Sequence, residues 1–294
     1  MYFLPNGLIL CIELFPQIGV FLKLYTKRRF SSKQMINVIV KNYYTLYFMA
    51  RQQIHNQYSG TLLGMLWAII HPILLLSVFW LVFTIGFKTQ VVGDKPFLLV
   101  LFCGLVVWMP FGEALGGAVQ SITGRAYLIK KIAFPMEILP LVSVAASMFS
   151  HFIAFVILML MFLYYGYLPG IGLLTLPFYF FCLIFLLSGI SWLLSAINVF
   201  YRDTSQTVSV ILNLWFWATP IVWDQSMLPE KYNFILKINP LAYIIAGYRS
   251  SLLHKDLILP PVEETLIFIS IATAIWFVGT FVFSKLKSSF ADVL

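Results

Sequence analysis

The sequence is poor in charged residues. Only 10% of its 294 residues are Asp, Glu, Lys or Arg, whereas 61% are hydrophobic. Soluble domains carry roughly 25% charged residues, so this chain has too few charges to cover a surface that faces water. The scarcity excludes an ordinary soluble protein and predicts a chain embedded in a membrane.

The sequence also lacks the motifs that nucleotide binding and metal binding require. No Gly-Lys pair occurs in the chain, which excludes the phosphate-binding loop of ATPases. The histidines and cysteines are scattered without the spacing of metal ligands or of catalytic groups. They are His55, His71, His151 and His254, and Cys11, Cys103 and Cys182. We therefore expect no catalytic residue, no metal site and no cofactor in this chain.

The first 34 residues lack the basic leading region of a secretory signal peptide. This apolar start contains Glu13 and Pro16, so we expect no cleavage there. Residues 1–34 form either an interfacial segment or an upstream extension, with Met35 as an alternative start. We treat them as an N-terminal extension to a single domain that covers residues 35–294.

Long stretches without Asp, Glu, Lys or Arg predict the membrane spans, because a crossing helix needs about 20 apolar residues. The uncharged stretch between Glu137 and Arg202 is far too long for one crossing, and Gly and Pro residues near its middle predict a turn. The expected spans cover residues 62–87, 97–122, 138–165, 173–198, 204–223 and 265–284. The predicted fold class is an all-α integral membrane protein with six transmembrane helices.

Cations concentrate on one side of the predicted membrane. Of the 19 Lys and Arg residues, 13 fall on the side that holds both termini and six fall on the other. Short cytoplasmic loops retain Lys and Arg, so both termini are predicted to be cytoplasmic. The formal charge of +8 then indicates contact with membrane lipid and not with nucleic acid.

Residues 34–56 combine a polar stripe with an apolar face. Gln34, Asn37 and Lys41 recur at helical spacing, and Arg51 extends the polar side. The pattern predicts an amphipathic interface helix that lies on the membrane. A soluble helix packed on a partner protein is the alternative, and it is compatible with the first.

The inner loop 123–136 alternates cationic and apolar residues and ends near a proline. A basic loop can simply mark the inner side of the membrane. The alternation also suits a short helix presented to a cytoplasmic protein. The candidate contact residues are Gly124, Arg125, Tyr127, Leu128, Lys130, Lys131, Phe134 and Pro135.

The outer segment 224–261 is long, and its apolar part is too short to cross a membrane. The Asn239-Pro240 pair predicts a break between two short re-entrant helices before the sixth span. Such helices line or gate a pathway, although a simple outer lid fits the pattern equally well. Tyr243 and Arg249 are the other residues of interest in this segment.

One acid, Glu113, lies inside a predicted span, where a charge is costly and marks a functional site by default. Pro110 and the neighbouring glycines offer the alternative that the helix is interrupted there. Aromatic rings also cluster in the spans, and their faces can stack on sugar rings. The candidate channel-lining residues are Trp67, Trp80, Trp108, Phe111, Glu113, Trp215, Trp217 and Trp223.

Five segments occur in a characteristic order along residues 35–294. They are QYSGTLLGMLWAIIHPILLLSVFWLVF, LIKKIAFPMEILPL, NVFYRDTSQ, NPLAYIIAGYRSSLL and LKSSFADVL. Together they resemble the permease subunits of type-2 ABC exporters, specifically those that move lipid-linked polysaccharides such as O-antigen, capsule or teichoic acid. His71 departs from the pattern, because a small polar amide is expected before Pro72.

The resemblance implies a homodimer of six-helix subunits with a channel between them, in the bacterial inner membrane. Two copies of a separate ATPase, which holds ATP and Mg, would drive it through a coupling and gate helix at residues 124–135. The interface helix would cover residues 34–57. The substrate would be a polymer on undecaprenyl diphosphate, and Arg125, Lys130, Lys131 or Arg202 would contact the diphosphate.

Two other functions remain open from the sequence. A drug or small-lipid exporter of the same superfamily would have the same topology. A membrane transferase acting on lipid-linked sugars would also use aromatic residues and inner cations. The transferase should, however, show clustered acids or histidines at one membrane level, and the sequence contains no such cluster.

Overall fold

The computed structural model describes residues 32–88, 91–92, 95–131, 134–223 and 225–294. Helices dominate these residues, so the predicted all-α fold class is confirmed. The expected N-terminal extension lies almost wholly outside the described residues. A short antiparallel hairpin, β1 (Val91–Val92) and β2 (Lys95–Pro96), was not predicted; it pairs Val91 with Pro96 and Val92 with Lys95.

Within the described residues, five helical segments are long and apolar enough to cross a membrane. They run Gly64–Gly86, Phe97–Val119, Met136–Tyr164, Ile171–Phe200 and Val262–Val293. Their main helices are α5 (Trp67–Trp80), α6 (Phe97–Val119), α8 (Leu139–Tyr164), α9 (Leu176–Phe200) and α13 (Val262–Leu286). Shorter pieces extend them: η2 (Gly64–Leu66), the π-helical η3 (Leu81–Gly86), η5 (Met136–Ile138), η6 (Ile171–Thr175), η9 (Lys287–Ser289) and α14 (Phe290–Val293). Five of the six predicted spans coincide with these segments to within a few residues, apart from the longer C-terminal end of the last.

The predicted span 204–223 is wrong in its C-terminal part. Its helix, α10 (Thr204–Ala218), has 15 residues, or about 22 Å at 1.5 Å per residue, whereas the hydrocarbon core is about 30 Å thick. Pro220 explains the stop, because a proline disfavours the α conformation in the residue before it. Thr219 is extended, with φ −102° and ψ 136°. The irregular backbone that follows is buried: Ile221 is 1% exposed.

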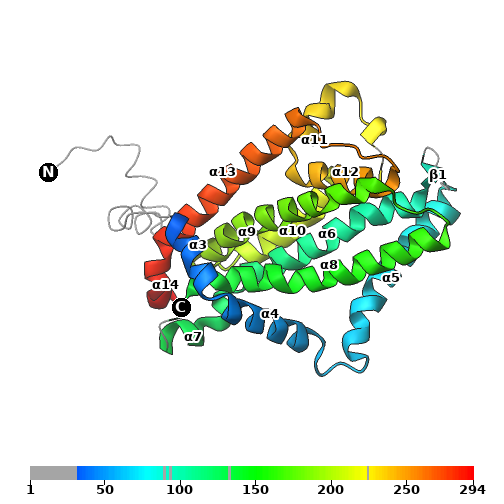
Figure 1. The fold of residues 1–294 in the computed structure, drawn as a ribbon. Coiled ribbons are helices and arrows are strands. Elements are labelled where there is room, and N and C mark those ends of the chain that lie inside the picture. Colours follow the sequence, from blue (N-terminus) through cyan, green and yellow to red (C-terminus); the bar gives the residue numbers. More distant parts are fainter. Residues whose placement is uncertain (1–31, 89–90, 93–94, 132–133, 224) are drawn as a thin grey trace.

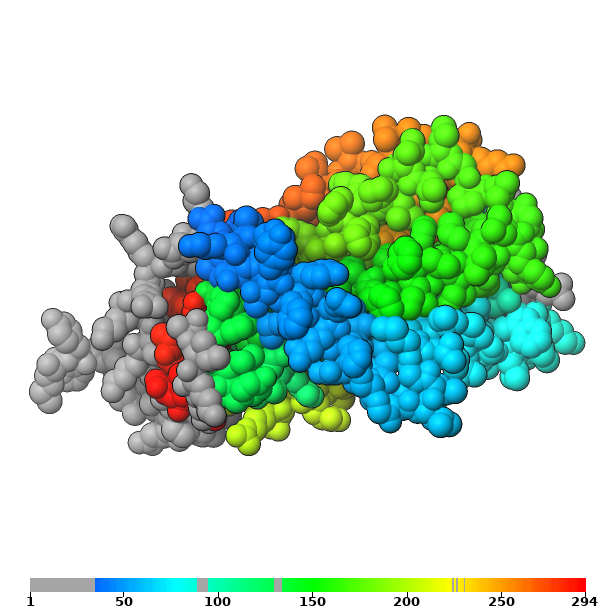
Figure 2. Space-filling view, turned by 60° about the horizontal axis from the view of Figure 1, so that its bottom comes forward, coloured from blue at the N-terminus to red at the C-terminus, as the bar shows by residue number. Residues whose placement is uncertain are grey.

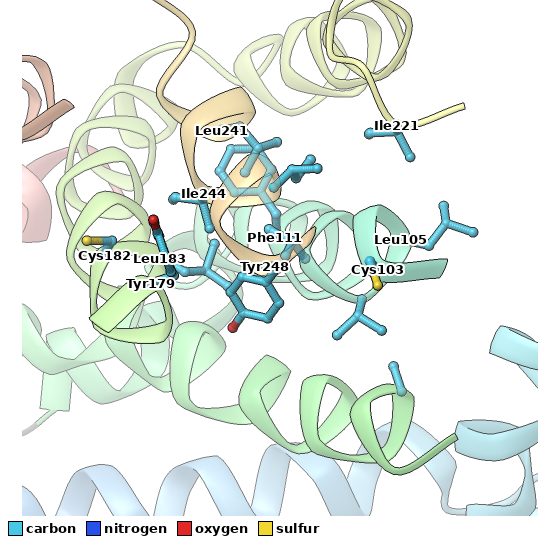
Figure 3. Packing of buried hydrophobic residues seen from close by; sticks show 14 of the residues in the cluster. Cys103, Leu105, Phe111, Tyr179, Cys182, Leu183, Ile221, Leu241, Ile244 and Tyr248 are labelled. Atoms are coloured by element: carbon cyan, nitrogen blue, oxygen red, sulfur yellow. The ribbon is translucent and has the colours of Figure 1, made fainter. Parts of the chain in front are cut away.

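The long helices lie side by side and pack on a short buried helix, α12 (Pro240–Leu253). Figure 1 shows α6, α8, α9 and α10 side by side, with α13 passing obliquely beside them. The predicted break at Asn239-Pro240 separates α11 (Asn233–Ile238) from α12. Figure 3 shows Leu241, Ile244 and Tyr248 of α12 among the side chains of the neighbouring helices, and all three are fully buried. The second re-entrant helix is therefore part of the hydrophobic core.

The predicted interface helix is split into α3 (Ser32–Lys41) and α4 (Tyr43–Tyr58). Asn42 stands between them, and its Nδ2 donates to the Val38 carbonyl at 2.7 Å. An asparagine side chain that bonds the preceding turn competes with the helix's own backbone, which explains the break. Figure 2 shows α3 and α4 (blue) on the surface, leading to α5 (cyan).

The side of α4 that faces away from the other helices carries large exposed aromatic side chains. Tyr44, Tyr47 and Phe48 are each about two thirds exposed or more. Tyrosine is enriched where a membrane meets water. This surface therefore supports the interfacial alternative for α4.

The inner loop is helical and packs beside the C-terminal helix α14. It forms η4 (Thr123–Arg125) and α7 (Ala126–Lys131), and α7 contacts α14. The loop after α10 contains two further single turns, η7 (Gln225–Met227) and η8 (Glu230–Tyr232). Figure 1 shows α3, α7 and α14 gathered at one end of the molecule.

A buried ion pair fixes the end of the inner loop to the C-terminal helix. The Lys287 ammonium donates to Oε1 of Glu137, whose side chain is only 8% exposed. Trp192 of α9 donates its Nε1–H to the Glu137 carbonyl at 2.9 Å. The other carboxylate oxygen, Oε2, is buried and has no hydrogen-bond partner among the described residues. The carboxylate thus depends on Lys287 for its compensation.

This dependence predicts an asymmetric response to mutation. We expect Lys287→Met to destabilise the fold by about 3 kcal/mol, because it leaves an uncompensated charge buried. Glu137→Gln should cost less, since the Lys287 side chain is 32% exposed and can reach water. The double variant should be more stable than Lys287→Met alone. Denaturant unfolding in detergent measures all three, and a Lys287→Met protein as stable as the parent would contradict the assignment.

Candidate functional site

An open cavity of about 640 Å³ lies between α4, α5, α6 and α8. It gathers three of the eight predicted channel residues: Trp67, Trp108 and Glu113. The lining residues are Gln57, Tyr58, Thr61, Trp67, Ala68, His71, Pro72, Leu75, Trp108, Met109, Glu113 and Ser150. Two indole rings, a carboxylate, an amide and hydroxyl groups thus face one space. That combination suits a ligand with both C–H faces and hydroxyl groups.

Glu113 lies on an unbroken helix. The alternative of an interrupted span is wrong, because α6 continues through Pro110 and the glycines to Val119. The Gln57 side chain donates to Oε1 of Glu113 at 3.0 Å, so α4 is tied to the carboxylate. Burial raises the pKa of the nearby Tyr58 hydroxyl, and the charge of Glu113 adds to the rise. The Tyr58 hydroxyl keeps its proton at neutral pH, as an ordinary tyrosine with a pKa of about 10 does, and can donate a hydrogen bond.

Other predicted channel residues serve the packing of the core. Phe111 is 0% exposed and meets the Trp215 ring edge-on, with centroids 5.2 Å apart. It has no surface to offer a pathway, so the prediction that it lines a channel is wrong. The reason is that Phe111 is covered by neighbouring rings, those of Trp215 on α10 and of Trp108 on its own helix. Trp215 is half-buried and is held by a hydrogen bond from its Nε1 to Asn239.

Three further tryptophans lie outside the lining of this cavity. Trp80 is 43% exposed and Trp217 is 61% exposed. Trp223 donates its Nε1–H to the Trp217 carbonyl at 3.0 Å. Trp80 and Trp217 thus expose part of their rings on the surface of the described chain.

The inner loop is attached to α4 through one of its cations. Arg125 donates to Oε1 of Gln53 at 2.8 Å and to the Ser121 carbonyl at 3.4 Å. Burial lowers the pKa of its guanidinium, which still stays protonated. Arg125 is thus engaged inside the protein.

The remaining loop residues differ in exposure. Gly124 is exposed and Tyr127 is 63% exposed, whereas Leu128, Phe134 and Pro135 are half-buried. Lys130 and Lys131 end α7, but their side chains lie outside the described part of the structure. Of the interface residues, Asn37, Lys41 and Arg51 are exposed, and the side chain of Gln34 is also outside the described part.

A second cavity, of about 430 Å³, lies between the inner loop and the turn that connects α9 to α10. It is lined by Gly124 and the exposed Arg202 among others, whereas Arg125 is not part of it. Asn198, which no sequence pattern indicated, lines it as well. Its Nδ2 donates to Thr123 at 3.3 Å, and its buried Oδ1 has no partner among the described residues. Of the predicted diphosphate contacts, Arg202 therefore lies at this cavity and Arg125 does not, while the side chains of Lys130 and Lys131 lie outside the described part of the structure.

The outer residues form hydrogen bonds that hold α10 to α12. Asn239 caps α12, because its Oδ1 accepts from the backbone N–H of Leu241 at 3.1 Å. The same oxygen accepts from Trp215, and Nδ2 donates to Oγ1 of Thr219 at 2.9 Å. On the other end of α12, Arg249 donates to the Ile221 carbonyl at 2.8 Å. The irregular backbone after α10 is thus fixed at both sides by α12.

Tyr243 and Pro240 complete this outer group. The Tyr243 hydroxyl shares a hydrogen bond of 2.7 Å with Thr265 at the start of α13. Pro240 is the first residue of α12 and is buried. A proline is tolerated there because the first helical N–H needs no intrahelical partner.

We expect Asn239→Ala to destabilise the fold by about 2 kcal/mol, because it removes a helix cap and two side-chain hydrogen bonds. Asn239→Asp keeps an oxygen acceptor for the cap and for Trp215, so it should retain more than half of the lost stability. Urea midpoints of the two variants in detergent measure the difference. Equal midpoints for the parent and Asn239→Ala would show that the cap carries no stability.

Comparison with known proteins adds a family and relatives. The ABC-2 type transporter family matches residues 44–253. Two relatives described as "O-antigen export system permease protein RfbA" from Klebsiella pneumoniae are each 30% identical over 240 residues, which is 81% of this chain and 90% of the relative. A relative with the same description from Myxococcus xanthus is 25% identical over 246 residues, 83% of this chain and 93% of the relative.

Proposed function

Because this chain belongs to the ABC-2 type transporter family, we propose that it is the permease of an ATP-driven exporter of lipid-linked polysaccharide. It is a multi-pass membrane transport subunit and not an enzyme. The observation that carries the substrate is the match to O-antigen export permeases along nearly their whole length. A drug exporter and a sugar transferase, the two alternatives, receive no support from these relatives.

The packing of α5 supports a second copy as partner. Only 11% of the residues in the most apolar part of its span are buried, compared with 72% for the span of α6. The cavity that holds Glu113 opens directly beside this helix. We infer that two copies face each other there and enclose a pathway, with Trp67 and Trp108 on its wall. The remaining exposed surface of α5 would contact lipid.

The driving force would come from two copies of a separate ATPase, which would hold ATP and Mg. In this proposal the inner loop and α3–α4 lie at the cytoplasmic face of the bacterial inner membrane, with both termini inside. Arg202 lines the second cavity together with Asn198 and would contact a diphosphate there.

Genetic complementation tests the substrate. A strain that makes the polymer but lacks its own permease should keep lipid-linked polymer inside. Co-expression of this chain with its ATPase should bring the polymer to the cell surface, detected with a polymer-specific antibody. Trp67→Ala should reduce export, whereas Trp217→Ala, which lies outside the cavity, should reduce it less. Drug resistance without polymer at the surface would instead support the small-molecule alternative.

A further inference from the structure

A third cavity, of about 570 Å³, lies at the opposite end of the molecule from the inner loop. Three segments distant in sequence form it: strand β2, the end of α8 with the loop after it, and the end of α12 with the two residues after it. Its polar lining residues are Lys95, Tyr167, His254 and Lys255. None of the three functions considered above uses this cavity.

The described lining is basic. It contains two lysines and a histidine, and none of its described members is Asp or Glu. The Lys95 ammonium lies 5.1 Å from the centroid of the Tyr167 ring, which holds it at the cavity. Lys95 and Lys255 thus bring two positive charges to one cavity. An anion is the ligand class that this charge favours.

The cavity wall is fixed by backbone contacts. The N–H of Ile171 donates to the Lys255 carbonyl at 3.1 Å. A Cβ at Gly170 would lie 2.0 Å from the same carbonyl oxygen, so only glycine lets the two segments approach this closely. The position of Lys255 relative to the end of α8 is therefore set before any ligand binds.

The floor of the cavity is apolar. Leu168, which is 67% exposed, and the half-buried Leu253 line it, and the fully buried Phe162 and Leu252 lie behind them. Basic groups above an apolar floor match an amphipathic anion better than a free inorganic one, because the charged and apolar parts each find a complementary surface. Phosphate at the end of a hydrocarbon chain has this form.

We propose that this cavity binds the phosphate group of a membrane lipid on the outer side. The proposal rests on the proposed function for its orientation and for one of two lipid sources. The phosphate would come either from a phospholipid or from the polyprenyl carrier after its transfer. Lys95 and Lys255 would contact the phosphate, and Leu168 and Leu253 would contact the first part of the chain.

Binding to the full chain in phosphatidylcholine nanodiscs tests this proposal without ATPase or polymer. The probes are phosphatidylglycerol, undecaprenyl phosphate, undecaprenyl diphosphate and inorganic phosphate. We expect at least one lipid phosphate to bind at least tenfold more weakly to Lys95→Gln/Lys255→Gln. The matched control, Lys88→Gln/Lys231→Gln, removes two other outer lysines and should change affinity less than twofold.

Each result decides the proposal. Binding of phosphatidylglycerol alone, or of the polyprenyl lipids, supports a lipid phosphate site and identifies the source. Equal loss in both double variants would show that net charge alone attracts the lipid, and would overturn it. Inorganic phosphate binding as tightly as the lipids would remove the role of the apolar floor and overturn it as well. If the parent chain binds the lipid phosphate but does not export polymer, the result counts against the proposed function only.

Discussion

Replacing Lys130 and Lys131 together with glutamate should abolish polymer export and leave membrane insertion intact. The two lysines end α7, which begins beside Arg125, a residue bonded to α4. Ile129 is 7% exposed and anchors this short helix to the core. If an ATPase binds the loop through the positive charges of the two lysines, glutamates at both positions would be repelled by the same surface. Such a reversal weakens the contact by several kcal/mol. At roughly 1.4 kcal/mol per factor of ten, export should fall more than tenfold.

Two control variants separate coupling from net charge. Lys130→Arg/Lys131→Arg keeps both charges and should retain export. Lys88→Glu/Lys231→Glu makes the same change in net charge on the outer side and should also retain it. The readouts are polymer at the cell surface and the amount of chain in the membrane fraction. Normal export by the glutamate variant would remove the loop from the mechanism.

Replacing Gly279 with leucine should prevent the chain from folding. Gly279 of α13 packs on α9, where an added Cβ would lie 2.1 Å from the backbone oxygen of Gly189. A backbone atom inside a helix cannot move aside as a flexible side chain can, so the helices must separate. Small residues let membrane helices approach closely, and overpacking typically costs about 1–3 kcal/mol even for modest enlargements. Gly279→Ala should therefore already lower stability, and the larger leucine should lower it further.

Gly116 provides the matched control. It lies on α6, and an added Cβ would meet nothing within 4 Å. Gly116→Ala should be neutral or stabilising, because alanine favours a helix over glycine by up to about 1 kcal/mol. Fluorescence-detected size-exclusion chromatography before and after heating compares the variants. A sharp, heat-resistant peak for Gly279→Leu would contradict the close packing of α9 and α13.

The positions of the long helices were predictable from composition, because a crossing helix needs a long apolar stretch whatever it packs against. The breaks were harder. Pro220 was a readable signal for the end of α10, and it was overlooked because the uncharged stretch continued past it. The break at Asn42 depends on a side chain that bonds the preceding turn, and no pattern of hydrophobicity reports that bond.

The candidate site was predictable only in part. Sequence identified aromatic residues in spans but not the face of the helix on which each ring lies. Trp108 and Phe111 are neighbours on α6, yet the first lines the cavity and the second is fully buried. The link between Gln57 and Glu113, 56 positions apart, requires three-dimensional packing. Asn198 gave no signal, since a lone amide at the end of a span is common.

The central claim, that this chain is the polymer-conducting half of an ATP-driven exporter, is tested most directly in proteoliposomes. The chain is reconstituted with its ATPase, and lipid-linked polymer is supplied on the ATPase side. The measurement is the fraction of polymer that reaches the opposite side and becomes inaccessible to an added glycosidase. We predict transfer that requires ATP and both proteins and that fails with Lys130→Glu/Lys131→Glu. Transfer that occurs without ATP, or chemical modification of the lipid-linked sugar by the chain alone, would contradict the account.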